Sequence, residues 1–95
     1  MTAAANPLVE HDASAQCFFI AIDAQRCVLD YTRQGTLMTI THTGVPEALG
    51  GRGLAAQLTH FALEYARAQR WKVIPRCSYV ATYMQRHAEF ASLLA

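Results

Sequence analysis

Hydrophobic and polar positions alternate along the first half of the chain with the period of two that is typical of β-strands. A continuous apolar run over 17–22 predicts a buried strand, and alternating residues over 26–33 and 36–43 predict two more. Because short turns separate the three segments, we expect an antiparallel meander. One face of its third strand is predicted to carry Met38, Ile40 and His42.

The second half of the chain changes to the 3.6-residue period of helices. A helix is predicted directly after Gly53, a short strand over 71–75, and a second helix over 78–87. The order β-β-β-α-β-α contains a strand–helix–strand crossover, so the third and fourth strands should be parallel. The sequence therefore predicts an α/β fold with a mixed sheet. The apolar stripe of the first helix is predicted to comprise Leu54, Leu58, Phe61, Ala62, Tyr65 and Ala66.

The length of 95 residues predicts one domain, which we expect over 8–95 after an Ala-rich leader, 1–7. With 53% hydrophobic and 16% charged residues, the chain should be globular. A net charge of +1 argues against nucleic acid or a membrane as partner, and no apolar run is long enough to span a bilayer. The three cysteines and four histidines lack metal-ligand spacing. We therefore expect no metal and a reduced, cytoplasmic setting.

Three of the four residues over 50–53 are glycine, and they stand between a predicted strand and a predicted helix. The first four N–H groups of a helix have no partner within it, and the helix dipole adds partial positive charge there. Glycines let an anion approach the backbone, and Arg52 adds a full charge, so this segment is typical of a phosphate site. A turn that binds nothing is the alternative interpretation. The spacing matches neither a Walker A loop nor a dinucleotide fingerprint.

The segment HTGVPEALGGRGLAAQL over 42–58 resembles the acetyl-coenzyme A signature of the GNAT acetyltransferase superfamily. More closely, the chain is similar to small single-domain GNAT-like proteins. Those proteins share a THT-x-VP strand end, a GRGLA loop and a later P-x-C-x-Y/F…Y…RH segment, which here is PRCSYVATYMQRH over 75–87. The resemblance extends over nearly the whole chain from about Leu8. It implies a minimal GNAT-like fold that binds acetyl-coenzyme A (acetyl-CoA).

The resemblance also implies how the cofactor lies on the chain. The pyrophosphate is expected on backbone N–H groups of 51–55, and the pantetheine arm along the end of the third strand, where the two parallel strands should splay. Arg86 and His87 are expected near the adenosine or its 3′-phosphate, with a solvated helix end as the alternative. The residues expected to bind the cofactor are Thr43, Gly44, Val45, Gly50, Gly51, Arg52, Gly53, Leu54, Ala55, Arg86 and His87.

Three positions depart from the pattern of the family. Gly50 stands where the superfamily usually has Arg or Gln, so one phosphate contact from a side chain is absent. Gly44 stands where the small relatives usually carry Glu, which removes a candidate general base. Ala88 follows His87 where Pro is common. The first two departures weaken the expectation of catalysis more than that of binding.

Acetyl transfer to an amine needs a base, a donor for the oxyanion and an acid for the leaving thiolate. Cys77 is a candidate nucleophile or acid, because a helix start and the adjacent Arg76 lower the pKa of a thiol. Cys17 and Cys27 lie in strand patterns and are expected in the core. The other catalytic candidates, each with core packing or a structural hydrogen bond as the alternative, are Tyr79, Tyr83 and His42.

The sequence leads to three hypotheses. The first is a monomer or weak homodimer that transfers acetyl from acetyl-CoA to an amine, with a protein lysine or N-terminus as candidate acceptors. The second is a non-catalytic module that binds coenzyme A or acyl-coenzyme A, which the residues at 44 and 50 favour. The third is a small interaction protein whose glycine cluster is only a turn.

Overall fold

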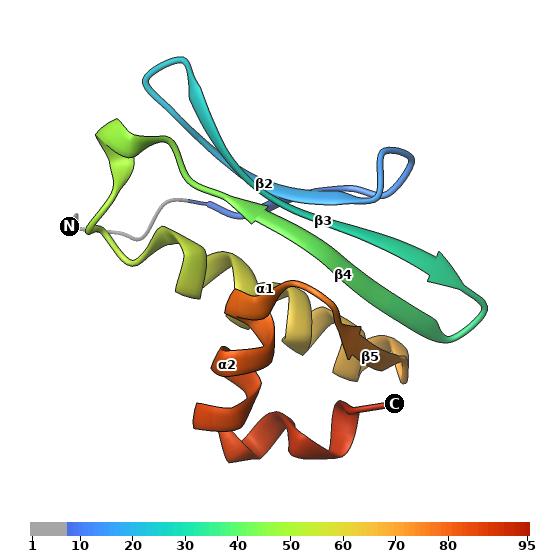
Figure 1. Ribbon diagram of the computed structural model, residues 1–95. Coiled ribbons are helices and arrows are strands. Elements are labelled where there is room, and N and C mark those ends of the chain that lie inside the picture. Colours follow the sequence, from blue (N-terminus) through green and yellow to red (C-terminus); the bar gives the residue numbers. More distant parts are fainter. Residues whose placement is uncertain (1–7) are drawn as a thin grey trace, which may run out of the picture.

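The strand patterns of the sequence produce a mixed sheet of five strands (Figure 1). The structure, a computed structural model, describes residues 8–95, so the predicted leader over 1–7 lies outside the described residues. The order in the sheet is β1-β2-β3-β4-β5, antiparallel except for the parallel pair β4–β5. The strands are β1 (Glu10–Asp12), β2 (Cys17–Ile22), β3 (Gln25–Gln34), β4 (Leu37–Gly44) and β5 (Lys72–Pro75).

Both long helices lie on the same face of this sheet (Figure 1). Helix α1 (Leu54–Gln69) connects β4 to β5 and packs on β2, β3 and β4, while α2 (Ser78–Arg86) follows β5. Two 3-10 helices accompany them: η1 (Glu47–Leu49) before the glycine cluster and η2 (Ala88–Leu93) after α2. The predicted α/β fold with a parallel crossover is confirmed. Among residues 8–95, no helix has the length and apolar character needed to cross a membrane.

The core lies between the sheet and α1, because alternate strand residues point to that face. In each strand of the meander, every second side chain is buried against the helices. The side chains between them point to the opposite face of the sheet, which has no helix on it in Figure 1 and which we call the open face. The strand residues of the core with no exposed surface are Phe18, Ile20, Cys27, Leu29, Met38, Ile40 and Val73. Cys27 is thus in the core, as predicted, whereas Cys17 is only partly buried.

The buried stripe of α1 differs from the predicted one. Phe61, predicted to be buried, is 38% exposed, while Leu63 and Thr59 are fully buried. The reason is that α1 packs on the sheet and also against α2 and η2, so its buried side widens toward those helices. Thr59 is accommodated because its hydroxyl donates a hydrogen bond of 2.8 Å to the Ala55 carbonyl.

Three elements of the structure were not predicted: β1 and the two 3-10 helices, η1 and η2. Strand β1 consists of Glu10, His11 and Asp12, so it has no apolar pattern from which a strand could be predicted. It forms because it pairs with β2. The last residues fold back to the other edge of the sheet. There Leu94 bridges to Val73 in parallel, which covers part of the free edge of β5.

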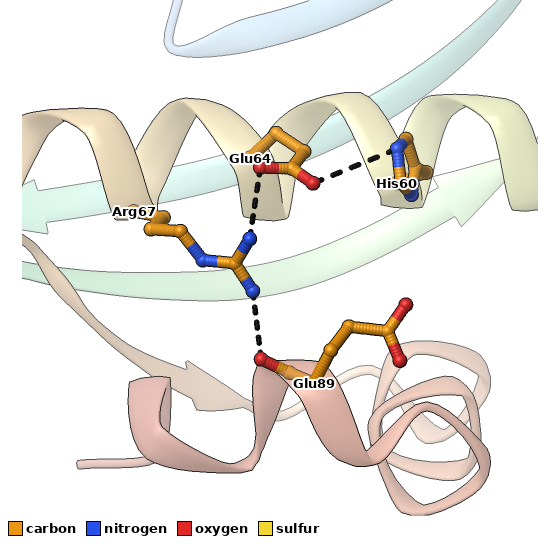
Figure 2. Close-up of polar contacts among 4 residues, drawn as sticks. All are labelled: His60, Glu64, Arg67 and Glu89. Atoms are coloured by element: carbon orange, nitrogen blue, oxygen red, sulfur yellow. Dashed lines mark hydrogen bonds and ion pairs between the residues drawn. The ribbon is translucent and has the colours of Figure 1, made fainter.

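Polar contacts hold η2 against α1, and Figure 2 shows them. Arg67 on α1 donates hydrogen bonds to the Glu64 carboxylate at 3.2 Å and to the Glu89 carbonyl at 2.7 Å. Its guanidinium also lies 4.8 Å from the Phe90 ring centroid. The His60 imidazole lies 3.8 Å from the other oxygen of the Glu64 carboxylate. These groups are largely exposed, so the buried Phe90 ring contributes more to this contact than the ion pairs do.

The packing of α1 on two sides is testable at Leu63. We expect Leu63→Ala to lower the free energy of unfolding by about 2–5 kcal/mol, because it leaves a cavity at a fully buried position of α1. The matched control is Leu94→Ala, which removes the same atoms from a side chain that is 47% exposed and should cost less than about 1 kcal/mol. Urea denaturation followed by circular dichroism measures both, and equal losses would contradict the description of this face.

Candidate functional site

The glycine cluster forms a loop that leaves the start of α1 without a side-chain cap. Gly51 and Gly53 have φ angles of +79° and +74°, in the left-handed region that only glycine adopts without cost. The first bond of the helix is donated by the Gln57 N–H to the Gly53 carbonyl at 3.0 Å. The N–H groups over 54–56 therefore have no acceptor within the helix, which is the arrangement that binds anions. Arg52 is exposed beside them.

Gly50 differs from the other two glycines of the loop. Its φ of −64° is ordinary extended backbone, so its conformation does not require glycine. A Cβ atom at this position would lie 3.2 Å from the Glu47 carbonyl oxygen, a tight contact. The departure from the Arg or Gln of the superfamily is therefore a change of side chain on a backbone that other residues can also adopt.

Strands β4 and β5 separate at the end of β5. Their parallel pairing ends with Ile40 and Pro75, and the Ile40 carbonyl then accepts hydrogen bonds from the N–H groups of both Arg76 and Cys77, each at 3.0 Å. Strand β4 continues to Gly44, paired only with β3. The edge of β4 over 41–44 is thus open on the side that β5 has left, at the place where the pantetheine arm was expected.

A β-bulge in β4 changes which side chains face the helices. Asp30 pairs with His42 and Tyr31 with Ile40, so Thr41 is an extra residue in β4. Because successive side chains alternate, the extra residue turns His42 to the open face, where it is exposed. The prediction that His42 shares a face with Met38 and Ile40 is therefore wrong, and the alternating pattern gave no sign of the bulge.

The bulge also brings His42 beside Gly44. A Cβ atom on Gly44 would lie 2.9 Å from Nε2 of His42, so one of the two side chains would have to shift. The contact involves the tip of an exposed side chain that can turn away, so it does not exclude a side chain at position 44.

On the helix side of the bulge, Thr43 meets Cys77. The Thr43 hydroxyl and the Cys77 sulfur lie 3.5 Å apart, and Cys77 is the N-cap residue of α2. Burial raises the pKa of the Cys77 thiol, but hydrogen bonds from Thr43 and from the backbone N–H groups of Val80 and Tyr79 outweigh it. The net pKa is lowered.

The pKa values of the other two cysteines are shifted in the opposite direction from that of Cys77. Burial, together with the neighbouring Asp30, raises the pKa of Cys17 to about 11, and burial also raises the pKa of Cys27. The predicted contribution of Arg76 to Cys77 is not among the causes of its lowered pKa. Arg76 instead lines a hollow of about 420 Å³ with Thr39 and Thr41.

Helix α2 and the first turn of α1 enclose a hollow of about 240 Å³. Tyr79 is 38% exposed and Tyr83 only 9%, and the Tyr83 ring stacks on His87 with 3.8 Å between ring centroids. Burial raises the pKa of both tyrosines, so each is protonated near neutral pH and can donate its O–H. The lining residues are Ala56, Tyr79, Thr82, Tyr83, Arg86 and His87.

The structure thus brings most of the predicted site residues into one region. The uncapped start of α1, the open edge of β4 and Cys77 surround the place where the strands separate, and the predicted residues of α2 line the hollow beside it. Thr82 and Ala56 were missed. The spacing of Thr82 from Tyr79 and Arg86, three and four residues, places it on the same helix face and could have identified it. Within residues 8–95, no group of three or more potential metal ligands is gathered.

Comparisons with known proteins agree with this geometry. A family model described as GCN5-related N-acetyl-transferase matches residues 17–93. Protein NATD1 of Homo sapiens and that of Mus musculus are each 32% identical over 82 residues, which is 83% of this chain and 73% and 74% of theirs. The NMR solution structure of a GCN5-like protein from Staphylococcus aureus, 24% identical, has a TM-score of 0.75 over 95% of this chain and 89% of its own. That structure shows the fold, and the family model and the relatives show that the chain belongs to the GCN5-related N-acetyltransferase family.

Proposed function

We propose that the chain binds acetyl-CoA between the glycine loop and α2 and transfers the acetyl group to an amine. The observation that carries this proposal is the separation of β4 from β5 directly beside Cys77, whose sulfur lies 3.5 Å from the Thr43 hydroxyl. Family membership supports the reaction type, because the family uses acetyl-CoA as its acetyl donor. The domain over 8–95 is then an acetyl-CoA-binding domain.

The pyrophosphate binds to the free N–H groups over 54–56, with the left-handed Gly51 and Gly53 bringing the backbone close to it. Arg52 adds a charge at the same place. The absence of a side-chain donor at Gly50 leaves the helix dipole and the backbone as the main source of affinity. Arg86 and His87, which line the hollow beside α2, are the groups offered to the adenosine or its 3′-phosphate.

The pantetheine arm lies along the open edge of β4 from Thr43 to Val45, as an added strand would. This places the thioester at the opening between the strands, near Cys77. The acceptor nitrogen attacks the thioester carbonyl, so that a C–N bond forms and the C–S bond breaks. The amine loses a proton to a base, and the coenzyme A thiolate takes one from a Tyr79 or Tyr83 hydroxyl, both of which are protonated near neutral pH.

Cys77 offers a second route through a covalent intermediate. Its thiolate would attack the thioester first, forming an acetyl-Cys77 thioester and releasing coenzyme A thiolate, and the amine would then take the acetyl group from Cys77. The lowered pKa of Cys77 favours this route, because it raises the thiolate fraction. On the acceptor side, the exposed His42 imidazole replaces the carboxylate that Gly44 lacks as a base.

The acceptor reaches this opening from the open face of the sheet. Only a turn over 13–16 joins β1 to β2, so no helices between these strands cover that face. An uncovered acceptor site suits a protein lysine or N-terminus better than a small amine, which needs a closed pocket.

A non-catalytic module that binds coenzyme A is the second candidate function. The observation that favours it is the glycine at position 44, which removes the carboxylate base of the small relatives. The phosphate site and the open edge of β4 serve binding equally well in this case. The two candidates differ in whether an acetyl group leaves the cofactor.

The glycine loop is tested by Gly53→Ala. The new Cβ atom meets nothing within 4 Å, so its effect comes from the φ of +74°, which costs an L-residue about 1–2 kcal/mol. Relaxation of that strain moves the N–H groups of the first turn, and we expect isothermal titration to show acetyl-CoA binding weakened about tenfold. The matched control is Gly35→Ala, with a φ of +60° and equally open space. It lies in the β3–β4 turn and should lose similar stability without loss of affinity. Equal binding by both variants would contradict the proposed pyrophosphate site.

The thiolate character of Cys77 is tested by alkylation with iodoacetamide at increasing pH. Since only the thiolate reacts, the rate rises through the pKa of Cys77, and its midpoint should lie below the ordinary value of 9.0. Thr43→Val removes the strongest of the lowering hydrogen bonds and should move the midpoint to higher pH. Thr39→Val, on the same strand but before the bulge, should leave it in place. Mass spectrometry of the labelled peptide separates Cys77 from Cys17 and Cys27, and a midpoint unmoved by Thr43→Val would refute this account.

Labelled acetyl-CoA distinguishes the enzyme from the binding module. For the covalent route we expect an acetyl group on Cys77, detected by mass spectrometry after brief incubation, and its loss in Cys77→Ser. For direct transfer we expect acetylated lysine peptides with no label on Cys77. Cys27→Ser is the control, because its sulfur is buried and its pKa is raised. Tight binding of acetyl-CoA with neither outcome would favour the module.

A further inference from the structure

A third hollow lies at the other end of α1 from the glycine loop, between the C-terminal part of that helix and the β1–β2 turn. Its volume is about 370 Å³. We call it the aromatic hollow, after the rings that wall it. The residues that define it are His11, Gln16, Tyr31, Arg33, Tyr65 and Trp71. None of them belongs to the region proposed to bind acetyl-CoA.

Two of the rings in the aromatic hollow pair their polar groups with each other. The His11 Nε2 and the Tyr31 hydroxyl form a hydrogen bond of 2.6 Å. Burial lowers the pKa of His11 against the opposing effect of the Asp12 carboxylate, so the imidazole is neutral near neutral pH. The His11 ring is stacked on Phe18 at 4.1 Å between centroids, and Tyr31 is only 4% exposed, so these two rings form the uncharged floor of the hollow. The partly buried rings of Tyr65 and Trp71 form the walls that a ligand can reach. Such walls suit a planar aromatic ring.

Arg33 supplies the charge of the aromatic hollow. It is the only charged side chain in the lining, and its guanidinium lies 4.7 Å from the Trp71 ring centroid. One of its N–H groups donates to the Gly35 carbonyl at 2.6 Å, which leaves other donors of the guanidinium for a ligand. Within residues 8–95, neither of the two ion pairs involves Arg33. A guanidinium that lies over an aromatic ring without a carboxylate partner is suited to bind one from a ligand.

Gln16 supplies an unpaired acceptor. Its Oε1 atom is buried and has no hydrogen-bond partner, although the backbone of the same residue is paired with Ala13 and Tyr31. An unpaired buried acceptor costs free energy. A turn of the terminal amide toward the hollow would give this oxygen a ligand donor that the protein does not supply.

We propose that the aromatic hollow binds a small aromatic carboxylic acid that carries a hydroxyl or amino donor. The ring packs against Tyr65 and Trp71, the carboxylate pairs with Arg33, and the donor reaches Gln16 Oε1. The site is separate from the acetyl-CoA site and does not depend on acetyl transfer. Its ligand is thus a second small molecule recognised by this chain.

Three probes that differ by one group each test this proposal. They are 4-hydroxyphenylacetate, its uncharged amide 4-hydroxyphenylacetamide, and phenylacetate, which lacks the hydroxyl donor. Trp71 is the only tryptophan of the chain and lies in the wall, so its indole N–H signal in ¹H–¹⁵N NMR spectra reports binding directly. For an acid of this size we expect saturation with a dissociation constant in the low millimolar range, roughly 1–5 mM. The amide should bind about tenfold more weakly, and phenylacetate should bind more weakly than the hydroxy acid.

Substitutions of Arg33 and Gln16 test which group of the ligand each side chain recognises. Arg33→Gln should remove the preference for the acid over the amide, and Arg33→Lys, which keeps the charge, should retain part of it. Arg26→Gln is the matched control, because Arg26 is also on β3 and lies over an aromatic ring, that of Phe19 at 4.0 Å, but on the open face. It should change nothing. Gln16→Met should reduce the affinity for 4-hydroxyphenylacetate to that for phenylacetate.

These measurements contain no acetyl-CoA, so their result does not depend on the proposed acetyl-CoA site. A saturable shift of the Trp71 signal, with the acid preferred and the preference lost in Arg33→Gln, supports it. A Trp71 signal that does not saturate up to about 20 mM acid overturns it. So does equal binding of acid and amide, or a preference that persists in a folded Arg33→Gln variant.

Discussion

The Ile40 carbonyl accepts hydrogen bonds from the N–H groups of Arg76 and Cys77, and the candidate site depends on this junction. A carbonyl oxygen has two lone pairs, and here both are used by residues that directly follow β5. The chain must therefore leave the sheet after Pro75, so that β4 continues with an open edge and α2 begins at Ser78. The open edge and the helix that carries the catalytic candidates are two consequences of one arrangement of hydrogen bonds.

The bulge at Thr41 adds a second constraint one residue further along β4. Its hydroxyl donates a hydrogen bond of 3.3 Å to the Asp30 carbonyl, which provides a partner where the regular ladder is interrupted. Because the bulge reverses the alternation, Thr43 faces Cys77 while His42 faces the open side. A strand without the bulge would place the imidazole in the core and the threonine in solvent. The bulge therefore separates the face at which we propose that the acceptor arrives from the side at which we propose that the cofactor binds.

Much of the fold could be predicted because its signals are local. The strand over 17–22 and the first helix follow from apolar periodicity, and the loop before that helix follows from its glycines. The face of His42 could not be predicted, since a bulge depends on the register with a neighbouring strand. The burial of Leu63 in place of Phe61 depends on how α2 and η2 return to α1, which no local pattern contains. The lowered pKa of Cys77 was predicted from the helix start and from Arg76. The backbone N–H groups of Val80 and Tyr79 supply the first of these two causes, Arg76 is not among the causes, and Thr43 supplies a cause that only the fold reveals.

Helix α1 carries a proposed site at each of its ends, and its packing bears on whether the two sites are coupled. Free N–H groups lie at its start, and Tyr65 in the aromatic hollow lies near its end. A ligand at one end alters affinity at the other only if it favours a second position of an element that both contact. Buried side chains from Leu54 to Ala66 fix α1 along its length, and the Trp71 N–H bonds the Ala66 carbonyl at 2.8 Å beyond its end. Moving the helix would disrupt close packing on two sides at once. The structure therefore favours two sites that fill independently, with α1 as a fixed spacer between them.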